Sequence, residues 1–437
     1  MTVNVYGAGL AGCEAAYQLA KRGIKVKLYD MKPHKKTPAH SSENFAELVC
    51  SNSLKAKRVE SAAGLLKEEM RRLDSLLVKC ADKCAVPAGG ALAVDRDEFS
   101  SLVTQEIKNH ENIEFISEEV TCFSDDEISI IATGPLTSDK LSEFIKEKFG
   151  DHLSFFDAAA PIVSAESIDM DHAFFESRYG KGDGDDYLNC PLNKEEYEVF
   201  YDALVNAERA PVHEFDVRDP KVYEGCMPIE VLAQRGVDTI RFGPMKPVGL
   251  RDPKTGHRPW AVLQLRKENT NGDMFNLVGF QTNLKFPEQK RVFGLIPALK
   301  NAEYHRYGVM HRNTFINSPM LLDADFALRE NKNTLFAGQI TGVEGYMESA
   351  SSGLLAGINA YRIACGLETV KLPVETMMGS LSKYISDKMV VDFQPMGANF
   401  GVLPELLDRP RDKKLRGAMY AQRSLECLDK FIKDNDL

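Results

Sequence analysis

The first thirty residues alternate between the hydrophobic patterns of strands and of a helix. Residues 3–6 form a β-branched and aromatic run typical of a buried strand, and residues 13–22 repeat apolar positions at helical spacing up to Gly23. Residues 24–29 alternate between apolar and polar side chains, and Asp30 follows them directly. The pattern predicts a strand, a helix and a second strand packed as one unit.

Further along the chain the same patterns return in a different order. Residues 61–84 carry the periodicity of one helical stretch, whereas residues 113–116 and 128–131 have the pattern of strands. From about residue 160 to residue 290 acids and aromatics become more frequent, and short alternating segments indicate an α+β region. A strand, a glycine-rich turn and a helix return over residues 334–365, so the first type of fold resumes near the C-terminus.

The turn between the first strand and the first helix has the spacing G-x-G-x-x-G, followed about twenty residues later by an acid. Its glycines permit a tight turn, let a pyrophosphate approach the backbone and let helix and strand pack closely. The helix N-terminus offers free N–H groups to phosphates, and the acid suits a ribose with a free 2′-hydroxyl, so FAD or NAD fits better than NADP. The residues predicted to bind the dinucleotide here are Gly7, Ala8, Gly9, Leu10, Ala11, Gly12 and Asp30.

Two later glycine turns favour FAD. Thr133 and Gly134 follow the strand at 128–131, where a turn would pass close to a bound dinucleotide. A second turn precedes the last predicted helix, whose N-terminus can stabilise negative charge on a reduced flavin; an ordinary βα unit is the alternative. The residues predicted to bind the flavin end are Gly338, Gln339, Gly342, Gly345 and Tyr346.

The combined patterns predict an α/β chain. We expect a glutathione-reductase-type FAD-binding Rossmann fold with an inserted α+β domain. The predicted division places the first part of the FAD-binding domain at residues 1–160, the inserted domain at 161–290, and the second part with the C-terminal helices at 291–437.

Composition adds limits on location and partners. The chain has 43% hydrophobic residues, 27% charged residues and a net charge of −10, with no apolar run of membrane-spanning length and no signal pattern before its first strand. We therefore expect no membrane partner. Nine cysteines without paired spacing indicate free thiols in a reducing compartment, and hence a cytoplasmic protein. Cys80 and Cys84 form the only close pair, and without a histidine cluster nearby they predict no metal site.

An acidic overall balance argues against indiscriminate binding of nucleic acid. Local basic clusters nevertheless leave room for a phosphate-bearing partner, although any one of them is typical of a solvated surface. The clusters are Lys32, Lys35 and Lys36; Lys55, Lys57 and Arg58; Arg251, Lys254 and Arg258; and Arg409, Arg411, Lys413, Lys414 and Arg416.

Two cysteines differ from the other seven in their surroundings. Small, polar and turn-forming residues flank Cys50 and Cys226, unlike the core of a helix. A thiol near basic groups or a helix N-terminus has a lowered pKa and becomes a nucleophile, although a single cysteine is more often a small buried hydrophobic residue. The pattern therefore ranks these two first without assigning them roles.

Seven stretches, in order and nearly end to end, carry a more specific signal: residues 7–12, 46–53, 86–96, 224–230, 242–250, 306–314 and 337–346. Together they resemble the folate- and FAD-dependent tRNA (uracil-5-)-methyltransferase family, and the last is also similar to the glucose-inhibited division protein A flavoproteins. The resemblance implies that methylenetetrahydrofolate supplies a one-carbon unit to C5 of a tRNA uridine by way of reduced FAD. NADPH or NADH would restore the reduced flavin.

The resemblance also implies roles for individual residues. Cys226 would add to C6 of uracil, and Cys50 would act as the base or as an assisting thiol. Tyr346 would pack on the flavin or the folate, with plain core packing as the alternative. The target uridine has to leave its stack, so we expect a pocket that opens onto a basic surface. His311 and Arg312 are predicted to contact flavin, folate or RNA phosphate, with an ordinary structural role as the alternative. Lys246 is the candidate for binding a phosphate or the glutamate tail of the folate.

Several alternatives stay open at this point. Methylation of a ribosomal RNA uridine would use the same site, so the sequence barely separates it from formation of ribothymidine in the tRNA T-loop. A small-molecule flavin oxidoreductase and a non-catalytic, FAD-bound RNA-binding module are other possibilities, but neither requires both Cys50 and Cys226. The sequence also leaves open the choice of NADH or NADPH, the roles of the two thiols and the oligomeric state.

Overall fold

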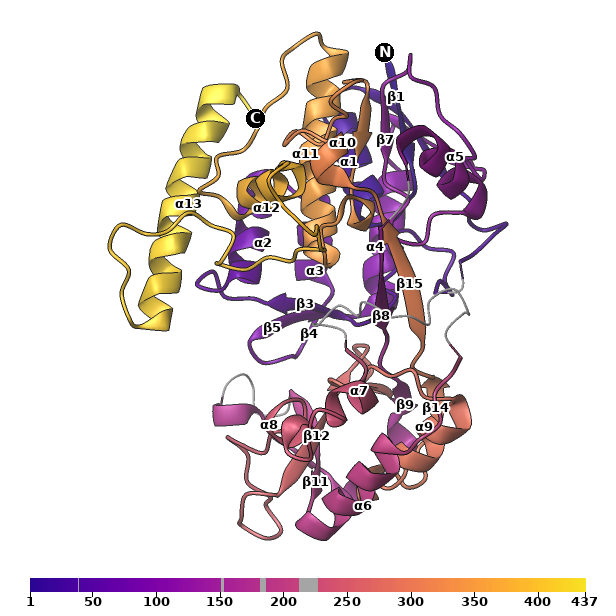
Figure 1. Cartoon of the computed structure of the whole chain (residues 1–437), viewed down its shortest axis with the longest axis vertical. Coiled ribbons are helices and arrows are strands. Elements are labelled where there is room, and N and C mark those ends of the chain that lie inside the picture. The colour runs from indigo at the N-terminus through magenta and orange to yellow at the C-terminus, as the bar shows by residue number, and fades with distance from the viewer. Residues whose placement is uncertain (38, 151–152, 181–185, 212–226) are drawn as a thin grey trace.

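The computed structural model describes residues 1–37, 39–150, 153–180, 186–211 and 227–437, with the backbone alone at 155–156 and 311–312. Two lobes lie along the long axis of the molecule, an upper lobe from both ends of the chain and a lower lobe from its middle (Figure 1). Between them run two antiparallel strands, β8 (Leu153–Ala158) and β15 (Met310–Phe315). The middle of the chain is therefore an insertion into the fold that its ends build.

The upper lobe contains a five-stranded parallel sheet. Its strands, in spatial order, are β16 (Thr334–Phe336), β7 (Ser129–Ile131), β1 (Thr2–Tyr6), β2 (Lys25–Asp30) and β6 (Ile113–Ser117). The chain passes from β1 to β2 on one side and later fills the other side with β7, so the strand order reverses at β1. In such sheets the carboxyl ends of the strands form a ligand-binding crevice at the reversal. The predicted Rossmann-type fold is confirmed.

Helices surround this sheet (Figure 1). They are α1 (Leu10–Ala20), α2 (Ala62–Arg72), α3 (Leu76–Lys83), α4 (Arg96–Lys108), α5 (Asp139–Phe149), α10 (Ser318–Leu321), α11 (Tyr346–Ala364), α12 (Met377–Ser386) and α13 (Lys413–Asn435). Glycines bring α11 into backbone contact with α1, because a Cβ at Gly353 would lie 2.1 Å from the carbonyl oxygen of Ala11. Within the described ranges, no helix is both long and apolar enough to cross a membrane.

The helical stretch predicted over residues 61–84 is two helices, α2 and α3. The chain turns sharply at Asp74, whose φ is +63°, and Ser75 then caps α3 by accepting a hydrogen bond from the Val78 N–H. The buried Glu14 of α1 accepts two more hydrogen bonds, from the N–H groups of Leu76 and Leu77. The periodicity of apolar residues continues through the break, so the pattern alone could not locate it.

A small antiparallel sheet forms the edge of the upper lobe that faces the lower lobe (Figure 1). Its strands, in spatial order, are β3 (Ser53–Ala56), β5 (Ala91–Val94) and β4 (Ala85–Val86). β3 begins three residues after Cys50, so this sheet helps to position the segment that carries that thiol.

The lower lobe has its own hydrophobic core and a six-stranded antiparallel sheet. In spatial order the strands are β10 (Phe174–Phe175), β11 (Tyr187–Leu192), β12 (Ala261–Lys267), β13 (Met274–Leu277), β9 (Ile162–Ser164) and β14 (Tyr304–Arg306). Its α-helices are α6 (Lys194–Val205), α7 (Ile229–Ala233), α8 (Thr239–Phe242) and α9 (Phe286–Phe293). Because β14 belongs to this sheet, we propose an inserted unit of residues 161–306 in place of 161–290.

Polar side chains join the two lobes. Arg266 on β12 donates to the Asn52 side chain over 2.8 Å, and Asn52 in turn donates to the carbonyl oxygen of Lys267 over 2.9 Å. Arg96 forms an ion pair of 2.5 Å with Glu268, which is buried. Buried charges need such partners, so these contacts fix the lower lobe against the segment around residue 50.

Candidate functional site

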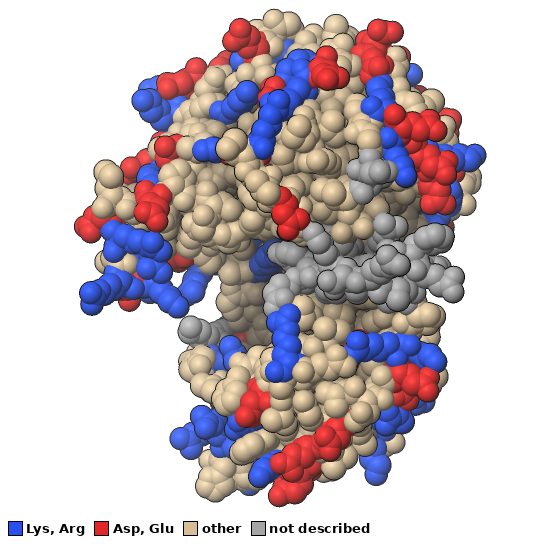
Figure 2. Space-filling model, in the orientation of Figure 1, with Lys and Arg blue, Asp and Glu red and all other residues tan. Residues whose placement is uncertain are grey.

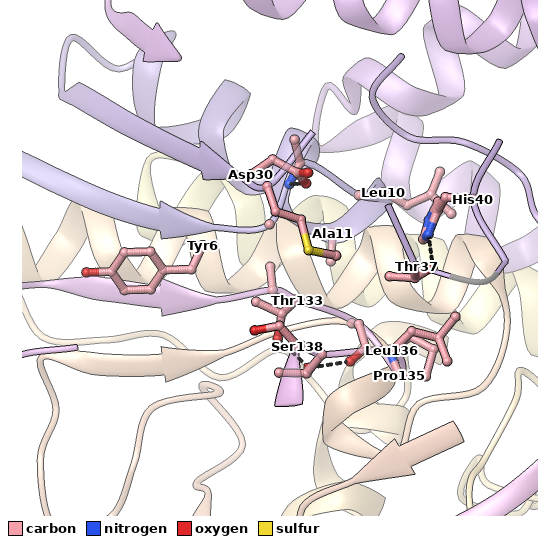
Figure 3. A pocket seen from close by; sticks show the side chains of 18 of the residues that line it. Tyr6, Leu10, Ala11, Asp30, Thr37, His40, Thr133, Pro135, Leu136 and Ser138 are labelled. Carbon is pink, nitrogen blue, oxygen red and sulfur yellow. Dashed lines mark hydrogen bonds between the residues drawn. The ribbon is translucent and has the colours of Figure 1, made fainter. Parts of the chain in front are cut away.

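A cavity opens at the carboxyl ends of the upper-lobe strands, where the order of the sheet reverses (Figure 3). Its walls are the loop after β1, the end of β2, the segment after β7 and the start of α11. The predicted cofactor-binding residues that line it are Gly7, Ala8, Gly9, Leu10, Ala11, Asp30, Thr133, Gly134, Gly338, Gln339 and Tyr346. Gly12, Gly342 and Gly345 are not among the lining residues.

The three glycines of the first turn have different physical roles. Gly7 has a φ of +103°, and a Cβ there would lie 2.6 Å from the carbonyl oxygen of Ala132 on the neighbouring turn. At Gly12 a Cβ would lie 1.7 Å from the carbonyl oxygen of Gly7, so this glycine lets α1 begin directly against the turn. A Cβ at Gly9 would meet nothing within 4 Å, because Gly9 faces the cavity. Only Gly9 leaves its space to a ligand.

Asp30 supports the same turn. One carboxylate oxygen accepts a hydrogen bond from the Ala8 N–H over 2.8 Å, and the other accepts from the Lys32 N–H over 3.0 Å. A carboxylate has about four acceptor sites, so two bonds leave acceptor capacity toward the cavity. The predicted contact with a ribose hydroxyl stays a prediction, and the structure adds a bracing role for Asp30 that the sequence did not indicate.

The wall opposite the glycine turn is the segment that follows β7 (Figure 3). Gly134 turns the chain with a φ of +71°, and the hydroxyl of Thr137 donates to its carbonyl oxygen over 3.0 Å. The hydroxyl oxygens of Thr133 and Thr137 lie 2.7 Å apart. These bonds hold the turn in a fixed shape.

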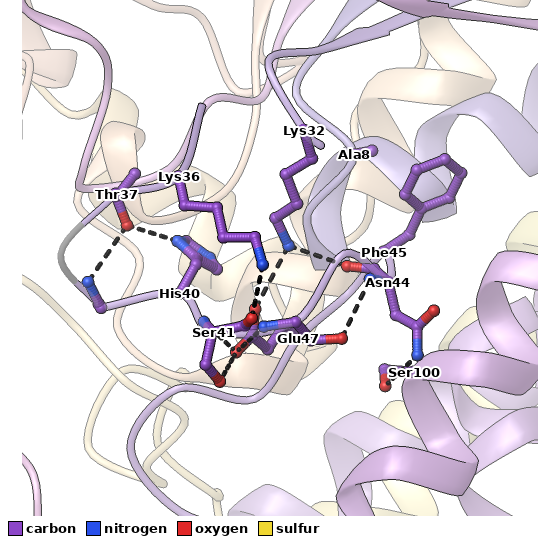
Figure 4. Close-up of polar contacts among 12 residues, drawn as sticks. Ala8, Lys32, Lys36, Thr37, His40, Ser41, Asn44, Phe45, Glu47 and Ser100 are labelled. Atoms are coloured by element: carbon purple, nitrogen blue, oxygen red, sulfur yellow. Dashed lines mark hydrogen bonds and ion pairs between the residues drawn. The ribbon is translucent and has the colours of Figure 1, made fainter. Parts of the chain in front are cut away.

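Glu47 organises the long loop after β2 (Figure 4). Its carboxylate accepts from the Ser41 N–H over 2.8 Å and from the Ser42 N–H over 3.2 Å, and it pairs with Lys32 over 3.3 Å. Burial alone would raise the pKa of Glu47, but these donors outweigh it and hold the pKa below its ordinary value. The long loop after β2 is thus a folded wall of the cavity.

The basic cluster at Lys32, Lys35 and Lys36 belongs to this wall and is internally satisfied. Lys32 is buried and donates to the carbonyl oxygen of Asn44 over 2.8 Å. Lys35 pairs with Glu119 over 2.7 Å, and Lys36 donates to the carbonyl oxygen of Ser41 over 2.7 Å. Each lysine therefore has a structural partner.

Tyr346 brings the last glycine-rich segment against the segment that carries Cys50. Its hydroxyl oxygen accepts hydrogen bonds from the Cys50 N–H over 2.7 Å and from the Ser51 N–H over 3.2 Å. Burial raises the pKa of Tyr346, so the phenol stays neutral. Tyr346 lines the cavity as predicted, and it also fixes the position of Cys50.

The Cys50 thiol faces a carboxylate. Its sulfur donates to a carboxylate oxygen of Asp157, on β8, over 3.4 Å. Burial and the negative charge of Asp157 raise the pKa of Cys50 well above its ordinary value. In this arrangement Cys50 is a protonated thiol with a proton acceptor beside it, which differs from the lowered pKa that the sequence context suggested.

Replacing Asp157 with asparagine is expected to lower the pKa of Cys50, because it removes the negative charge that disfavours the thiolate. The pH midpoint for alkylation of the Cys50 peptide, followed by mass spectrometry, should fall by about one unit or more. Asp434→Asn, which changes an exposed acid near the end of α13, serves as the matched control. An unchanged midpoint in the Asp157 variant would show that the carboxylate does not control this thiol.

Arg96 and Glu344 complete the surroundings of Cys50. Arg96 donates to the carbonyl oxygens of Leu48 and Cys50, over 2.8 and 3.4 Å, and thereby links this segment to the lower lobe. Glu344 is buried and accepts from the amide of Gln339 over 2.7 Å. Burial, reinforced by Asp157, raises the pKa of Glu344 to about 8, so this acid is protonated at neutral pH.

Some predicted site residues are not brought to the cavity or cannot be placed. Cys226 and the side chains of His311 and Arg312 lie outside the described residues, although the backbone of the latter two belongs to β15. Lys246 follows α8 in the lower lobe, where it is exposed and is not among the residues that line the cavity.

Sequence reasoning assigned no role to Asp157, Arg96 or Glu344. Arg96 and Glu344 lie inside stretches on which the family resemblance rests. The resemblance therefore marked their segments but indicated no chemical role for either residue. Asp157 lies in a strand with no motif and meets Cys50 only through the fold. No local pattern marks such a partner.

Comparison with known proteins places this chain in a family. Residues 2–368 match the family described as "Glucose inhibited division protein A". The chain is 60% identical over 98% of its length to "Methylenetetrahydrofolate--tRNA-(uracil-5-)-methyltransferase TrmFO" of Acetivibrio thermocellus, covering 98% of that relative. It is 56% identical to the protein of that name from Brevibacillus brevis, covering 99% of this chain and 98% of the relative.

Solved structures support the fold. A crystal structure of Aquifex aeolicus GidA superposes with a TM-score of 0.70 at 16% identity, covering 98% of this chain and 73% of that one. A second crystal form of GidA gives a TM-score of 0.67 over 99% of this chain and 78% of that one. At this identity the similarity concerns the architecture alone.

Proposed function

Because the chain belongs to the methylenetetrahydrofolate–tRNA-(uracil-5-)-methyltransferase family, we propose that it methylates C5 of a uridine in tRNA. Methylenetetrahydrofolate is the proposed carbon donor and FAD the proposed bound cofactor, with NADPH or NADH as reductant. The observation that carries this proposal is 60% identity, over 98% of both chains, to a relative named for this activity. The cavity at the switch point of the sheet supports it independently.

The residues of the cavity fit FAD. Gly9 leaves an open position for the pyrophosphate, and the loop from Gly7 to Ala11 would hold that group at the start of α1. Asp30 would take the ribose, and Gln339 and Tyr346 would lie at the flavin end. When bound, FAD supplies the reducing equivalents and carries the one-carbon unit. The protein itself binds and orients the reactants and transfers protons.

The chemistry that remains for the protein is activation of uracil, whose C5 is a poor nucleophile. In the proposed mechanism the Cys226 thiolate adds to C6, and the electron pair of the C5–C6 double bond moves so that C5 becomes enolate-like. C5 then bonds to the one-carbon unit derived from methylenetetrahydrofolate. A base then removes the C5 proton while the bond between the one-carbon unit and its carrier nitrogen breaks, which leaves an exocyclic methylene group on C5. Hydride delivered to this methylene completes the methyl group as the Cys226 sulfur leaves C6 and the C5–C6 double bond re-forms.

Cys50 is the proposed acceptor of the C5 proton, or an assistant to it. A protonated thiol cannot accept a proton, but Asp157 lies 3.4 Å from the sulfur and can take the thiol proton first. Tyr346 and Arg96 hold the backbone on both sides of Cys50, so its position is fixed before substrate arrives. This arrangement supports a proton-transfer role for Cys50 and leaves nucleophilic addition to Cys226.

The proposed target is the T-loop uridine that becomes ribothymidine. Purified protein would be incubated with methylenetetrahydrofolate, NADPH and either a tRNA transcript or a ribosomal RNA fragment, and the nucleosides analysed by mass spectrometry. The proposal expects 5-methyluridine in tRNA alone. 5-Methyluridine in ribosomal RNA alone would show that ribosomal RNA, not tRNA, is the substrate.

Cys226→Ala is expected to give no detectable methylated uridine while retaining bound flavin, because the nucleophile at C6 is lost. Cys122→Ala, which removes an exposed thiol, is the control and should methylate like the wild type. A small-molecule flavin oxidoreductase would keep its turnover after loss of Cys226. Full methylation by the Cys226 variant would remove this residue from the mechanism.

We also propose that the protein works in the reducing cytoplasm. Eight cysteines are free among the residues that the structure describes, including the exposed Cys122 and Cys365. Free thiols at the surface are typical of a reducing compartment.

A further inference from the structure

Two basic segments far apart in the sequence meet at the edge of the upper lobe. Lys57 and Arg58 follow β3, whereas residues 409–416 comprise the approach to α13 and its first turn. A Cβ at Gly417 would lie 2.2 Å from the carbonyl oxygen of Glu60, so the start of α13 touches the turn after Arg58. Figure 2 shows Lys and Arg side chains gathered at the lower left edge of this lobe, beside the hollow between the lobes and where Figure 1 places the start of α13.

Most cations of this edge have no ion-pair partner among the residues that the structure describes. In the described part of the chain none of the following enters an ion pair: Lys57, Arg58, Arg411, Lys413 and Lys414. Arg409 lies 3.5 Å from Glu405, but both side chains are exposed. The one acid within the second segment, Asp412, caps α13 by accepting from the Leu415 N–H over 2.7 Å. In a chain of net charge −10, this is a concentrated local excess of positive charge.

Helix stability does not explain these cations. Lys413 and Lys414 occupy the first turn of α13, and no acidic residue is present there. The positive end of the helix dipole disfavours lysine in that turn and favours acids. The sequence therefore places charges where they weaken the helix, which points to a role in binding an anion.

The basic edge is continuous with the candidate site. Lys55 in β3 forms an ion pair of 2.7 Å with Glu348, in the same turn of α11 as the cavity-lining Tyr346. Only a few residues along β3 separate Cys50 from Lys57. An RNA strand held at the edge would thus lie beside the segment that carries the proposed proton acceptor.

We propose that this basic surface, defined by Lys57, Arg58, Arg409, Arg411, Lys413 and Lys414, binds the phosphate backbone of the RNA whose uridine is methylated. The inference rests on the proposed function and names the part of the chain that docks its substrate. Lysine and arginine contacts to phosphate position a nucleic acid without reading its sequence. Such contacts suit an enzyme whose target base must leave its stack and enter a pocket.

The test uses the full-length, flavin-bound protein with Arg411→Glu, Lys413→Glu and Lys414→Glu combined. Its affinity for a tRNA transcript, measured by fluorescence anisotropy, should fall at least about tenfold at physiological salt. The dependence of log affinity on log salt concentration should become shallower by about 3, one for each lost phosphate contact. Thermal stability should stay equal or rise, because glutamate suits the first turn of α13.

The matched control is Lys430→Glu with Lys433→Glu, which alters exposed lysines near the other end of the same helix. It should bind tRNA like the wild type. Unchanged affinity in the triple variant, or an equal loss in the control, would overturn the inference. A raised KM for methylenetetrahydrofolate with unchanged RNA affinity would also overturn it, since the surface would then bind the anionic tail of the folate. If the proposed function itself is wrong, the wild-type protein will methylate no RNA, and this result is distinct from a failure of the docking inference alone.

Discussion

Gly12→Ala is expected to yield a protein without bound flavin and with a lower free energy of unfolding. A methyl group at this position would lie 1.7 Å from the carbonyl oxygen of Gly7, and 2.9 Å from its carbonyl carbon. Neither α1 nor the turn can shift freely, because a Cβ at Gly7 would in turn lie 2.6 Å from the carbonyl oxygen of Ala132. Overpacking of this kind costs about 3 kcal/mol, and here it falls on the loop that forms the proposed pyrophosphate site.

Gly9→Ala is expected to weaken cofactor binding without affecting the stability of the fold. Nothing lies within 4 Å of a Cβ at Gly9, and its φ of −77° and ψ of −169° suit alanine. The free energy of unfolding of the apoprotein should therefore stay within about 0.5 kcal/mol of the wild type. The methyl group would occupy space left for the cofactor, so flavin content after purification should fall.

Both variants are measured by the flavin absorbance of the purified protein and by urea denaturation of the apoprotein. Gly90→Ala is the control, because a Cβ there also meets nothing within 4 Å and Gly90 does not line the cavity. Full flavin content in the Gly12 variant would contradict the assigned geometry of the turn.

Glu69→Ala is expected to lower the free energy of unfolding by about 3–5 kcal/mol. Glu69 is fully buried in α2, and its carboxylate accepts hydrogen bonds from the Met377 and Met378 N–H groups over 2.7 and 2.8 Å. It also accepts from the Ser424 hydroxyl over 2.5 Å, so one side chain connects α2, α12 and α13. Alanine would leave three buried donors without an acceptor.

The same residue predicts a pH dependence of stability. Burial raises the pKa of Glu69 from 4.5 to about 7, although its three donors act in the opposite direction. The unfolded chain therefore releases this proton at lower pH than the folded chain, and the contribution of Glu69 to stability falls as pH rises from about 4.5 through 7. Urea denaturation at several pH values should show this slope in the wild type and a smaller one in Glu69→Gln. Equal slopes would contradict the raised pKa.

Local sequence patterns predicted the part of the fold that forms the cavity. The strand, glycine turn, helix and acid of residues 2–30 are formed by neighbours along the chain, so their spacing alone identifies them. The glycine turns after β7 and β16 were predictable for the same reason. These segments converge because parallel strands present their carboxyl ends at one edge of the sheet.

The surroundings of Cys50 depended on contacts between distant segments. Cys50 forms hydrogen bonds with Asp157, 107 residues away, and with Tyr346, 296 residues away. No spacing of residues in the sequence predicts either contact. The raised pKa of Cys50 follows from these neighbours and from burial, whereas its local sequence suggested a more acidic thiol. The break between α2 and α3 likewise depends on Glu14 of α1.

The proposed reaction is tested most directly by following the carbon atom that methylenetetrahydrofolate donates. Flavin-bound protein would receive NADPH, a tRNA transcript and methylenetetrahydrofolate with a heavy-carbon label in its methylene group, and the T-loop nucleosides would be analysed by mass spectrometry. The proposed reaction predicts 5-methyluridine that carries one labelled carbon and that forms only when folate, reductant and flavin are all present. Unlabelled 5-methyluridine, or no methylated uridine from the fully supplied protein, would contradict it.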